Sequence, residues 1–105
     1  MVRPHPSDGH VDPPLPRSAA EVLARTLRAV ADPTRLQMLS VILGAEDQRA
    51  TVGQLAEVLG LRQPTVTHHA HILVEDGSLE RHRDGKFIWL SVSPDRRAAI
   101  EDLLR

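Results

Sequence analysis

Residues 52–76 constrain the fold more tightly than any other part of the chain. Apolar residues recur there at helical spacing on both sides of Gly60, a residue that readily adopts the left-handed conformation in which helices end. Residues 51–54 read T-x-x-Q, the capping-box pattern that begins a helix. The pattern therefore predicts two helices joined by a tight turn, one over residues 52–59 and one over residues 63–76.

The second of these helices is predicted to have two unlike faces. Winding the sequence at about 100° per residue places Val66, Ala70 and Leu73 on one apolar stripe. The opposite face is polar, short-chained and almost uncharged, and it carries Pro64, Thr67, His68 and His71. An ordinary solvated face would favour Glu, Lys and Arg, whereas this one suits contact with hydrogen-bonding edges. Helix, turn and helix is the arrangement that places its second member in a DNA major groove.

Further helices are predicted on the N-terminal side of this pair. Residues 18–21 read S-x-x-E, a second capping-box pattern, and predict a helix that ends near Ala31. Asp32 is the predicted N-cap of the next helix, because Pro33 fits its first turn and leucine and isoleucine follow at helical spacing up to Gly44. The polar segment that follows is expected to be a loop.

A hairpin and a last helix are predicted after the pair. Asp84-Gly85 lies between two short strand-like runs, residues 79–83 and 86–91, and predicts a two-residue hairpin turn. Apolar residues alternate on both faces of the second run, which predicts a strand covered on both sides. Ser93-Pro94 predicts the start of a helix that ends near Leu104. The expected fold is mainly α with a small β-hairpin, in the order α-α-α-α-β-β-α.

Composition limits the class of protein. A chain of 105 residues suits one small domain, and we expect it over residues 18–105, after a disordered proline-rich arm over residues 1–17. The chain has no cysteine, which removes disulfides, thiolate metal sites and thiol catalysis. The formal net charge is −1, so any DNA contact must rest on a local basic patch. No apolar run approaches membrane-spanning length and the N-terminus lacks an apolar signal core, so we expect a cytoplasmic protein without membrane partners.

Four motifs, taken together, resemble one family. They are ADPTRL at residues 31–36, VGQLAE at 52–57, QPTVTHH at 63–69, and GK at 85–86 before a strand. The combination resembles the arsenic-repressor (ArsR/SmtB-type) winged helix-turn-helix regulators over about residues 18–104. The resemblance implies a homodimer that represses transcription by binding an operator and leaves it when a signal is sensed. It also implies that the first and last helices form the dimer, here through Val22, Leu23, Leu27, Ile100, Leu103 and Leu104.

The chain also departs from the pattern of that family. Metal-sensing members often carry a cysteine pair on the helix corresponding to residues 52–59, and others use Asp and His on the last helix. Here there is no cysteine, and the last helix has carboxylates at Asp95, Glu101 and Asp102 but no histidine. The usual helix-opening serine is replaced by Arg62. We therefore predict no cofactor and no metal site, and leave open whether the signal is a metal held by histidines and carboxylates or a non-metal cue.

The predicted DNA contacts divide into readers and positioning residues. Glutamine, threonine and histidine side chains can all hydrogen-bond to base edges. The readers are Gln63, Thr65, Thr67, His68 and His71. Arginine and lysine at the turn and around the hairpin tip would contact phosphates or the adjacent minor groove. They are Arg62, Arg81, Arg83 and Lys86.

Roles are also predicted for two further side chains. His69 lies nearer the buried stripe and is predicted to be a packing histidine. Arg35 is expected either to contact the DNA backbone or to form a surface ion pair.

Two other functions fit the sequence less well. An enzyme is not expected, because no nucleophile–base spacing, phosphate loop or metal triplet is present. A winged helix used only for protein–protein contact would be expected to carry a large apolar or aromatic anchor on its outward helix face, which this sequence does not supply there. The sequence thus favours a dimeric DNA-binding transcriptional regulator, a repressor whose partners are an inverted-repeat operator and a second copy of itself.

Overall fold

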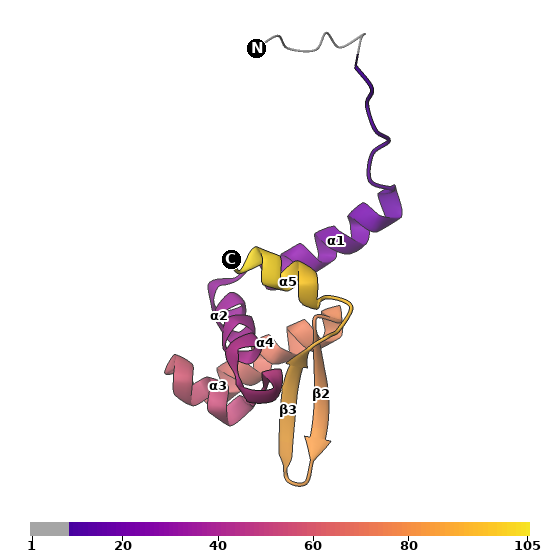
Figure 1. The fold of residues 1–105 in the computed structure, drawn as a ribbon. Coiled ribbons are helices and arrows are strands. Elements are labelled where there is room, and N and C mark those ends of the chain that lie inside the picture. Colours follow the sequence, from indigo (N-terminus) through magenta and orange to yellow (C-terminus); the bar gives the residue numbers. More distant parts are fainter. Residues whose placement is uncertain (1–8) are drawn as a thin grey trace.

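Five α-helices and one three-stranded antiparallel sheet make up residues 9–105, the part of the chain that the computed structural model describes (Figure 1). In chain order the elements are α1 (Arg17–Val30), α2 (Pro33–Gly44), the short 3₁₀ helix η1 (Glu46–Gln48), β1 (Arg49–Thr51), α3 (Val52–Leu59), α4 (Gln63–Asp76), β2 (Leu79–Asp84), β3 (Phe87–Val92) and α5 (Arg97–Leu103). The fold is mainly helical with a β-hairpin, as predicted. Of the predicted arm, residues 1–8 lie outside the described residues, and residues 9–16 are exposed and in neither a helix nor a strand.

Local capping signals account for where the central helices begin and end. The Asp32 carboxylate accepts the backbone N–H of Arg35 at 3.0 Å, so α2 is capped as predicted. Thr51 and Gln54 form the predicted capping box of α3, with reciprocal side chain to backbone hydrogen bonds of 3.1 and 3.0 Å. Gly60 ends α3 at a φ of 66°, in the left-handed region that costs glycine least. The caps therefore set where α2 and α3 begin, and Gly60 sets where α3 ends.

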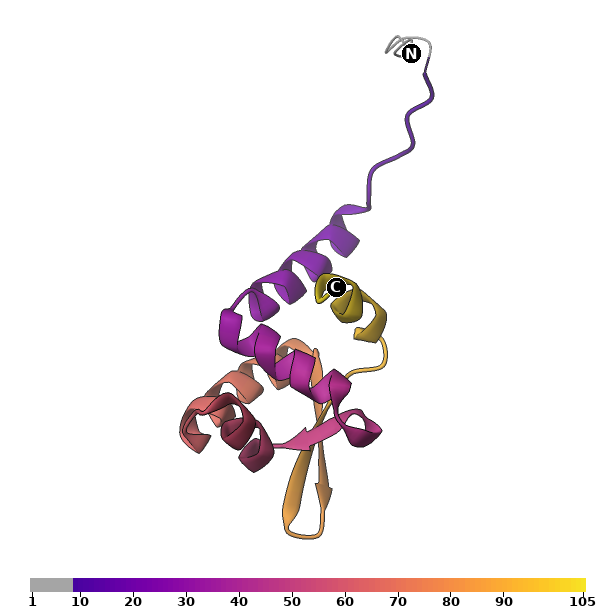
Figure 2. The ribbon, with the colours of Figure 1, turned by 60° about the vertical axis from the view of Figure 1, so that its left-hand side comes forward.

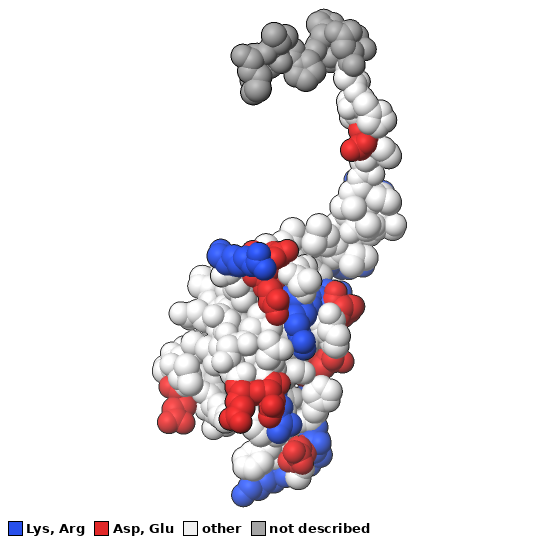
Figure 3. Space-filling view, in the orientation of Figure 1, with Lys and Arg blue, Asp and Glu red and all other residues white. Residues whose placement is uncertain are grey.

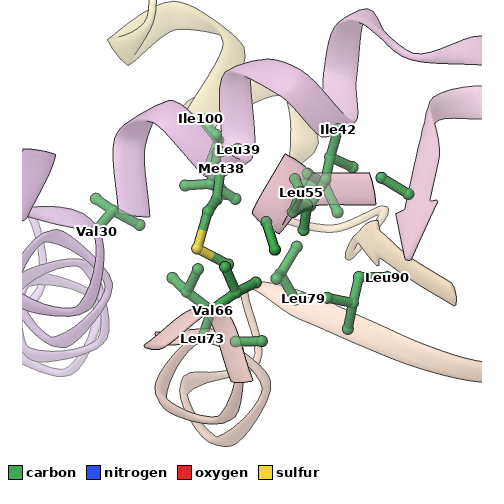
Figure 4. Close-up of a cluster of buried hydrophobic side chains, with 14 residues drawn as sticks. Val30, Met38, Leu39, Ile42, Leu55, Val66, Leu73, Leu79, Leu90 and Ile100 are labelled. Atoms are coloured by element: carbon green, nitrogen blue, oxygen red, sulfur yellow. The ribbon is translucent and has the colours of Figure 1, made fainter. Parts of the chain in front are cut away.

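One aliphatic core holds the helices against the sheet (Figure 4). The stripe predicted for α4 is confirmed, since Val66, Ala70 and Leu73 are all buried. They meet large buried side chains from α2, α3, the sheet and α5, namely Met38, Leu39, Ile42, Leu55, Leu79, Leu90 and Ile100. Because the apolar stripe of α4 is buried in this core, the opposite face of the helix is exposed to solvent.

The sheet differs from the prediction in two ways. Residues 49 and 50 were expected to be loop and Thr51 a helix cap, but residues 49–51 form β1, which pairs with β3 to give the strand order β1-β3-β2. A strand of three residues is too short to show an alternating apolar pattern in the sequence. This strand forms only because it pairs with β3, far along the chain. The two-residue turn is Gly85-Lys86 and not Asp84-Gly85, because Asp84 pairs with Phe87 and the positive φ of 63° falls on Gly85.

The predicted starts of the first and last helices were also wrong. α1 begins at Arg17 without a side-chain cap, and Glu21 instead pairs with Arg17 at 3.2 Å, so the S-x-x-E box does not form. α5 begins at Arg97 rather than at residue 94. The backbone N–H of buried Ser93 donates to the carbonyl of Ser78 at 2.9 Å, which holds the chain on the sheet, and a turn must follow before the helix can start.

α1 and α5 lie side by side at the end of the molecule opposite the hairpin tip, as both ribbon views show (Figures 1 and 2). Only Thr26, Ala29 and Val30 of α1 are buried, all in its C-terminal half. Most of the apolar side of α1 is therefore not covered by the described part of the chain. No helix in residues 9–105 combines the length and the apolar character needed to cross a bilayer.

Candidate nucleic-acid interface

α3 and α4 pack against each other across a turn of three residues. The backbone N–H of Leu61 donates to the carbonyl of Ala56 at 2.9 Å, which closes the end of α3. α4 then begins at Gln63, with Pro64 in its first turn, where a missing N–H breaks no helical hydrogen bond. Arg62 occupies the N-cap position, and its side chain makes no capping bond. The arginine that replaces the usual serine is thus left free to reach outward.

The outward face of α4 carries the predicted readers. The side chains of Gln63, Thr65, Thr67, His68 and His71 are all exposed. His71 lies 3.2 Å from the Glu75 carboxylate one turn later, and both of these side chains remain largely exposed. The face therefore offers short hydrogen-bonding groups on a helix whose other side is fixed in the core.

His69 is the histidine of α4 that does not face outward, as predicted. Its side chain is only 16% exposed, and its Nδ1 accepts a hydrogen bond from Nε of Arg35 at 3.1 Å. Arg35 in turn donates from Nη1 to the carbonyl of Ala29 at 2.7 Å. The guanidinium of Arg35 therefore ties α4 to the α1–α2 junction. Within residues 9–105 the expected surface ion pair does not form, whereas the expected contact with the DNA backbone stays a prediction.

Asp32 joins the same cluster. Its carboxylate lies 3.9 Å from Nδ1 of His69 while it caps α2. The backbone N–H of Arg35 is the main cause that holds the pKa of the Asp32 carboxyl below its usual value; partial burial opposes this, and the charges of His69 and Arg35 add to it. The cluster fixes the rotation of α4 about its own axis and so the direction in which the readers point.

The β2–β3 hairpin forms the wing, and its tip is basic. Arg81, Arg83 and Lys86 are exposed, and within residues 9–105 none of them takes part in an ion pair. Figure 3 shows Lys and Arg side chains gathered at the lower end of the molecule, over this hairpin, with an acid among them. Arginine and lysine side chains without an ion-pair partner are well suited to bind phosphates.

The covering of β3 was only half predicted. Leu90 and Val92 are buried at the base of the hairpin, but Phe87 is 51% and Ile88 is 37% exposed. The expectation of a strand covered on both sides was therefore wrong for its first half, because the hairpin extends beyond the core (Figure 1). Apolar side chains thus lie beside the basic residues of the wing.

This arrangement matches proteins of known class. Residues 30–83 match a family described as a helix-turn-helix domain. A relative from Streptomyces lividans, named "Probable mercury resistance operon repressor", is 38% identical over 91 residues, which cover 87% of this chain and 70% of the relative. HlyU from Vibrio cholerae N16961 has a similar structure, with a TM-score of 0.75 and 27% identity over 83% of this chain and 92% of HlyU. A solved ArsR family transcriptional regulator gives a TM-score of 0.63 and 28% identity over 79% of this chain and 88% of its own.

The chain belongs to the ArsR/SmtB-type family of winged helix-turn-helix transcriptional regulators. α3 and α4 are the helix-turn-helix of this family, and the β2–β3 hairpin is its wing. DNA binding and the control of transcription follow from this membership.

The residues of this ArsR/SmtB-type protein do not fit the usual metal sites of the family. The chain has no cysteine, and α5 has no histidine. Within the part of the chain that the structure describes, no three side chains of His, Asp or Glu come together as a metal ion requires.

The predicted dimer residues separate into two groups. Val22, Leu23, Leu27 and Leu103 are each between 41% and 49% exposed, as residues that await a partner would be. Ile100 is only 1% exposed and belongs to the core of the single chain, which corrects its expected place on the dimer surface. Leu104 is half-buried against the same core. α5 must therefore use one side for its own subunit, so less of it is left to face a second copy.

One functional contact was missed by sequence reasoning. Nη1 of Arg96 lies 3.1 Å from the Asp76 carboxylate at the end of α4 and 2.7 Å from Oγ1 of buried Thr26 in α1. Ser78 also donates its hydroxyl to Asp76. Three segments that are distant in sequence meet here, and no local pattern announces the contact. It links the helix that carries the readers to the two helices expected to form the dimer.

Proposed function

We propose that the protein is a homodimeric repressor that binds an inverted-repeat operator through α4 and the wing and leaves it when a signal is sensed. The observation that carries the proposal is the outward face of α4, which is polar, free of basic and acidic side chains over its first two turns apart from histidine, and flanked by unpaired wing cations. Such a face can enter a major groove while the wing contacts the backbone. Repression is supported by the relative from Streptomyces lividans, which is named a repressor.

Dimerisation is supported by the uncovered apolar side of α1. An amphipathic helix gains most of its stability by burying its apolar stripe, and no residue in the N-terminal half of α1 is buried against residues 9–105. A second copy related by a twofold axis would supply the missing surface and would present two copies of α4. Two recognition helices roughly 34 Å apart read half-sites one helical turn apart, which makes the operator an inverted repeat.

Footprinting on the DNA upstream of the protein's own gene tests the proposal. We expect protection of an inverted repeat at low and at moderate salt, and no protection of a shuffled sequence of the same composition. Protection that is equal on both DNAs, or absent from both, would contradict it. Repeating the footprint with a panel of metals, oxidants and small organic acids would then identify the class of signal.

A further inference from the structure

A groove lies between α4 and the wing. Its volume is about 490 Å³, within the range of roughly 300–1,000 Å³ that small-molecule sites occupy. One wall is the outward side of α4, the other is the hairpin, and the start of α3 closes one end. The groove thus lies between the two elements that carry the predicted DNA contacts, α4 and the wing.

The groove is lined in large part by apolar side chains. Phe87, Ile88 and Leu90 line it from β3, and Val74 lines it from α4. Phe87 and Ile88 are the exposed members of this set. Exposed apolar side chains beside a concavity mark a binding surface more often than an ordinary solvated one. A ligand with an aromatic or branched aliphatic body would cover them.

The charged residues that line the groove are all of one sign. These residues are Arg81 and Lys86 of the wing, and no aspartate or glutamate is among the lining residues, while His71 lines the groove from α4 as a further hydrogen-bonding group. The nearest acid on α4, Glu75, pairs with His71 but does not line the groove. Gln63 and Thr67 add hydrogen-bonding groups at the same rim. The charge pattern selects an anionic head group.

We propose that this groove binds a small amphipathic anion, an aromatic or branched aliphatic carboxylate, and that this anion and DNA exclude each other. The proposal rests on the proposed DNA-binding function. It names the chemical class of the signal that would release the protein from its operator. Exclusion follows from shared residues: Gln63, Thr67, His71, Arg81 and Lys86 line the groove and are also predicted DNA contacts. A side chain that holds the anion cannot at the same time hold a base edge or a phosphate.

Binding can be tested in the absence of DNA with a pair of fluorescent probes. Anilinonaphthalene sulfonate supplies the aromatic body with an anionic head, and N-phenylnaphthylamine supplies the same body without charge. We expect saturable binding of the anionic probe, about tenfold tighter than that of the neutral probe. Lys86→Gln should raise the Kd for the anionic probe by about threefold to tenfold and leave the Kd for the neutral probe unchanged.

A matched pair of variants locates the site. Ile88→Glu puts a negative charge on the apolar wall and should abolish binding of the anionic probe. Val58→Glu makes the same change at a side chain on α3 that is 66% exposed and does not line the groove, and it should leave binding unchanged. Because both side chains are exposed, both variants should fold, and equal melting temperatures would verify this. Loss of binding in Val58→Glu, or retention in Ile88→Glu, would overturn the assignment.

Competition is measured by titrating benzoate, with benzamide as the neutral control, against a labelled operator fragment. We expect the apparent Kd for DNA to rise with benzoate and to stay constant with benzamide. If the protein binds its DNA but does not prefer the anionic probe, the groove inference fails and the proposed function stands. If it binds the probe in the groove but never binds DNA, the proposed function fails, and the exclusion of DNA fails with it. DNA that stays bound at saturating benzoate would also overturn the exclusion.

Discussion

At the scale of single residues, the helix cap formed by Asp32 is linked through Arg35 to His69 in α4. Asp32 caps α2 in a way that three neighbouring residues suffice to predict, since its carboxylate accepts the Arg35 N–H. The same arginine then bonds through its side chain to His69, 34 residues later. The cap therefore also positions the group that fixes the recognition helix.

The lowered pKa of Asp32 predicts how its contribution to stability depends on pH. Asp32→Ala removes the cap and should lower the free energy of unfolding by about 1 kcal/mol at neutral pH. Because the folded-state pKa lies below the usual value of 3.8, the stabilisation is fully present above pH 3.8 and is lost as the pH falls through the folded pKa. Urea denaturation of both proteins from pH 7 to the lowest pH at which they fold measures this difference.

Asp32→Asn is the matched control for that measurement, because asparagine caps helices about as well as aspartate. It should retain most of the stability at neutral pH and lose the pH dependence. A difference between wild type and Asp32→Ala that grows on acidification would contradict the assignment.

The division between readers and positioning residues predicts different losses in two variants. Thr67→Ala should lower the affinity for the operator by about 1–3 kcal/mol and leave the affinity for unrelated DNA almost unchanged. Arg83→Ala should weaken both DNAs by similar factors, because a phosphate contact carries no sequence information. Fluorescence anisotropy with both DNAs at one salt concentration measures the two losses. If the variants behave alike, the division does not hold.

At the scale of elements, the cluster of Arg96, Asp76 and Thr26 holds α1, α4 and the start of α5 together. The Asp76 side chain is only 11% exposed and that of Arg96 21%, so their interaction is only partly screened by water. Gly77 directly follows α4 at a φ of 89°, and a Cβ built there would lie 3.5 Å from Nη2 of Arg96. The end of the recognition helix is thus packed against the arginine as well as paired with it.

Removing the arginine should reveal the pairing. Arg96→Met keeps an extended side chain but leaves a largely buried carboxylate without its cation, and should cost about 2 kcal/mol of unfolding free energy. Adding Asp76→Asn should restore part of the loss, with an interaction energy of about 1 kcal/mol in a double-mutant cycle. Urea denaturation gives all four values, and strictly additive losses would show that the pair is not coupled.

The elements also show what local sequence could and could not predict. The rotation of α4 followed from the spacing of Val66, Ala70 and Leu73, because a helix repeats within a few residues. β1 was missed because its three residues become a strand only by pairing with β3. The outward residues of the candidate site were found for the same reason as the helix, whereas the groove required knowing how closely the wing approaches α4.

At the scale of the whole molecule, two surfaces are left without partners. One is the polar face of α4 with the basic wing, and the other is the apolar side of α1 with Leu103 of α5. They lie at opposite ends of the fold (Figure 1), so a second copy can cover the apolar one without hiding the polar one. The Arg96 cluster joins the helices that carry them, because it connects α1, α4 and the start of α5.

We expect DNA binding to depend on pairing through the apolar surface, and Leu23→Glu tests this dependence. The substitution removes apolar burial from the expected dimer interface and places two unpaired glutamates across the twofold axis. It should weaken dimerisation by about 3 kcal/mol, which raises the dissociation constant of the dimer roughly a hundredfold. The subunit should still fold, because Leu23 is 45% exposed in the single chain. Sedimentation equilibrium measures the association, and circular dichroism verifies the fold.

The same variant should change how DNA binding depends on salt. Arg62, Arg81, Arg83 and Lys86 offer about four phosphate contacts per subunit, so the dimer should give a slope of log affinity against log salt of about −7, and the monomer about half of that. Val58→Glu adds the same charge to an exposed apolar position on α3, outside the expected interface, and should keep the steep slope. A Leu23→Glu protein that is monomeric and yet binds the operator with wild-type affinity and slope would mean that one subunit suffices for recognition, and twofold pairing would then have no part in reading DNA.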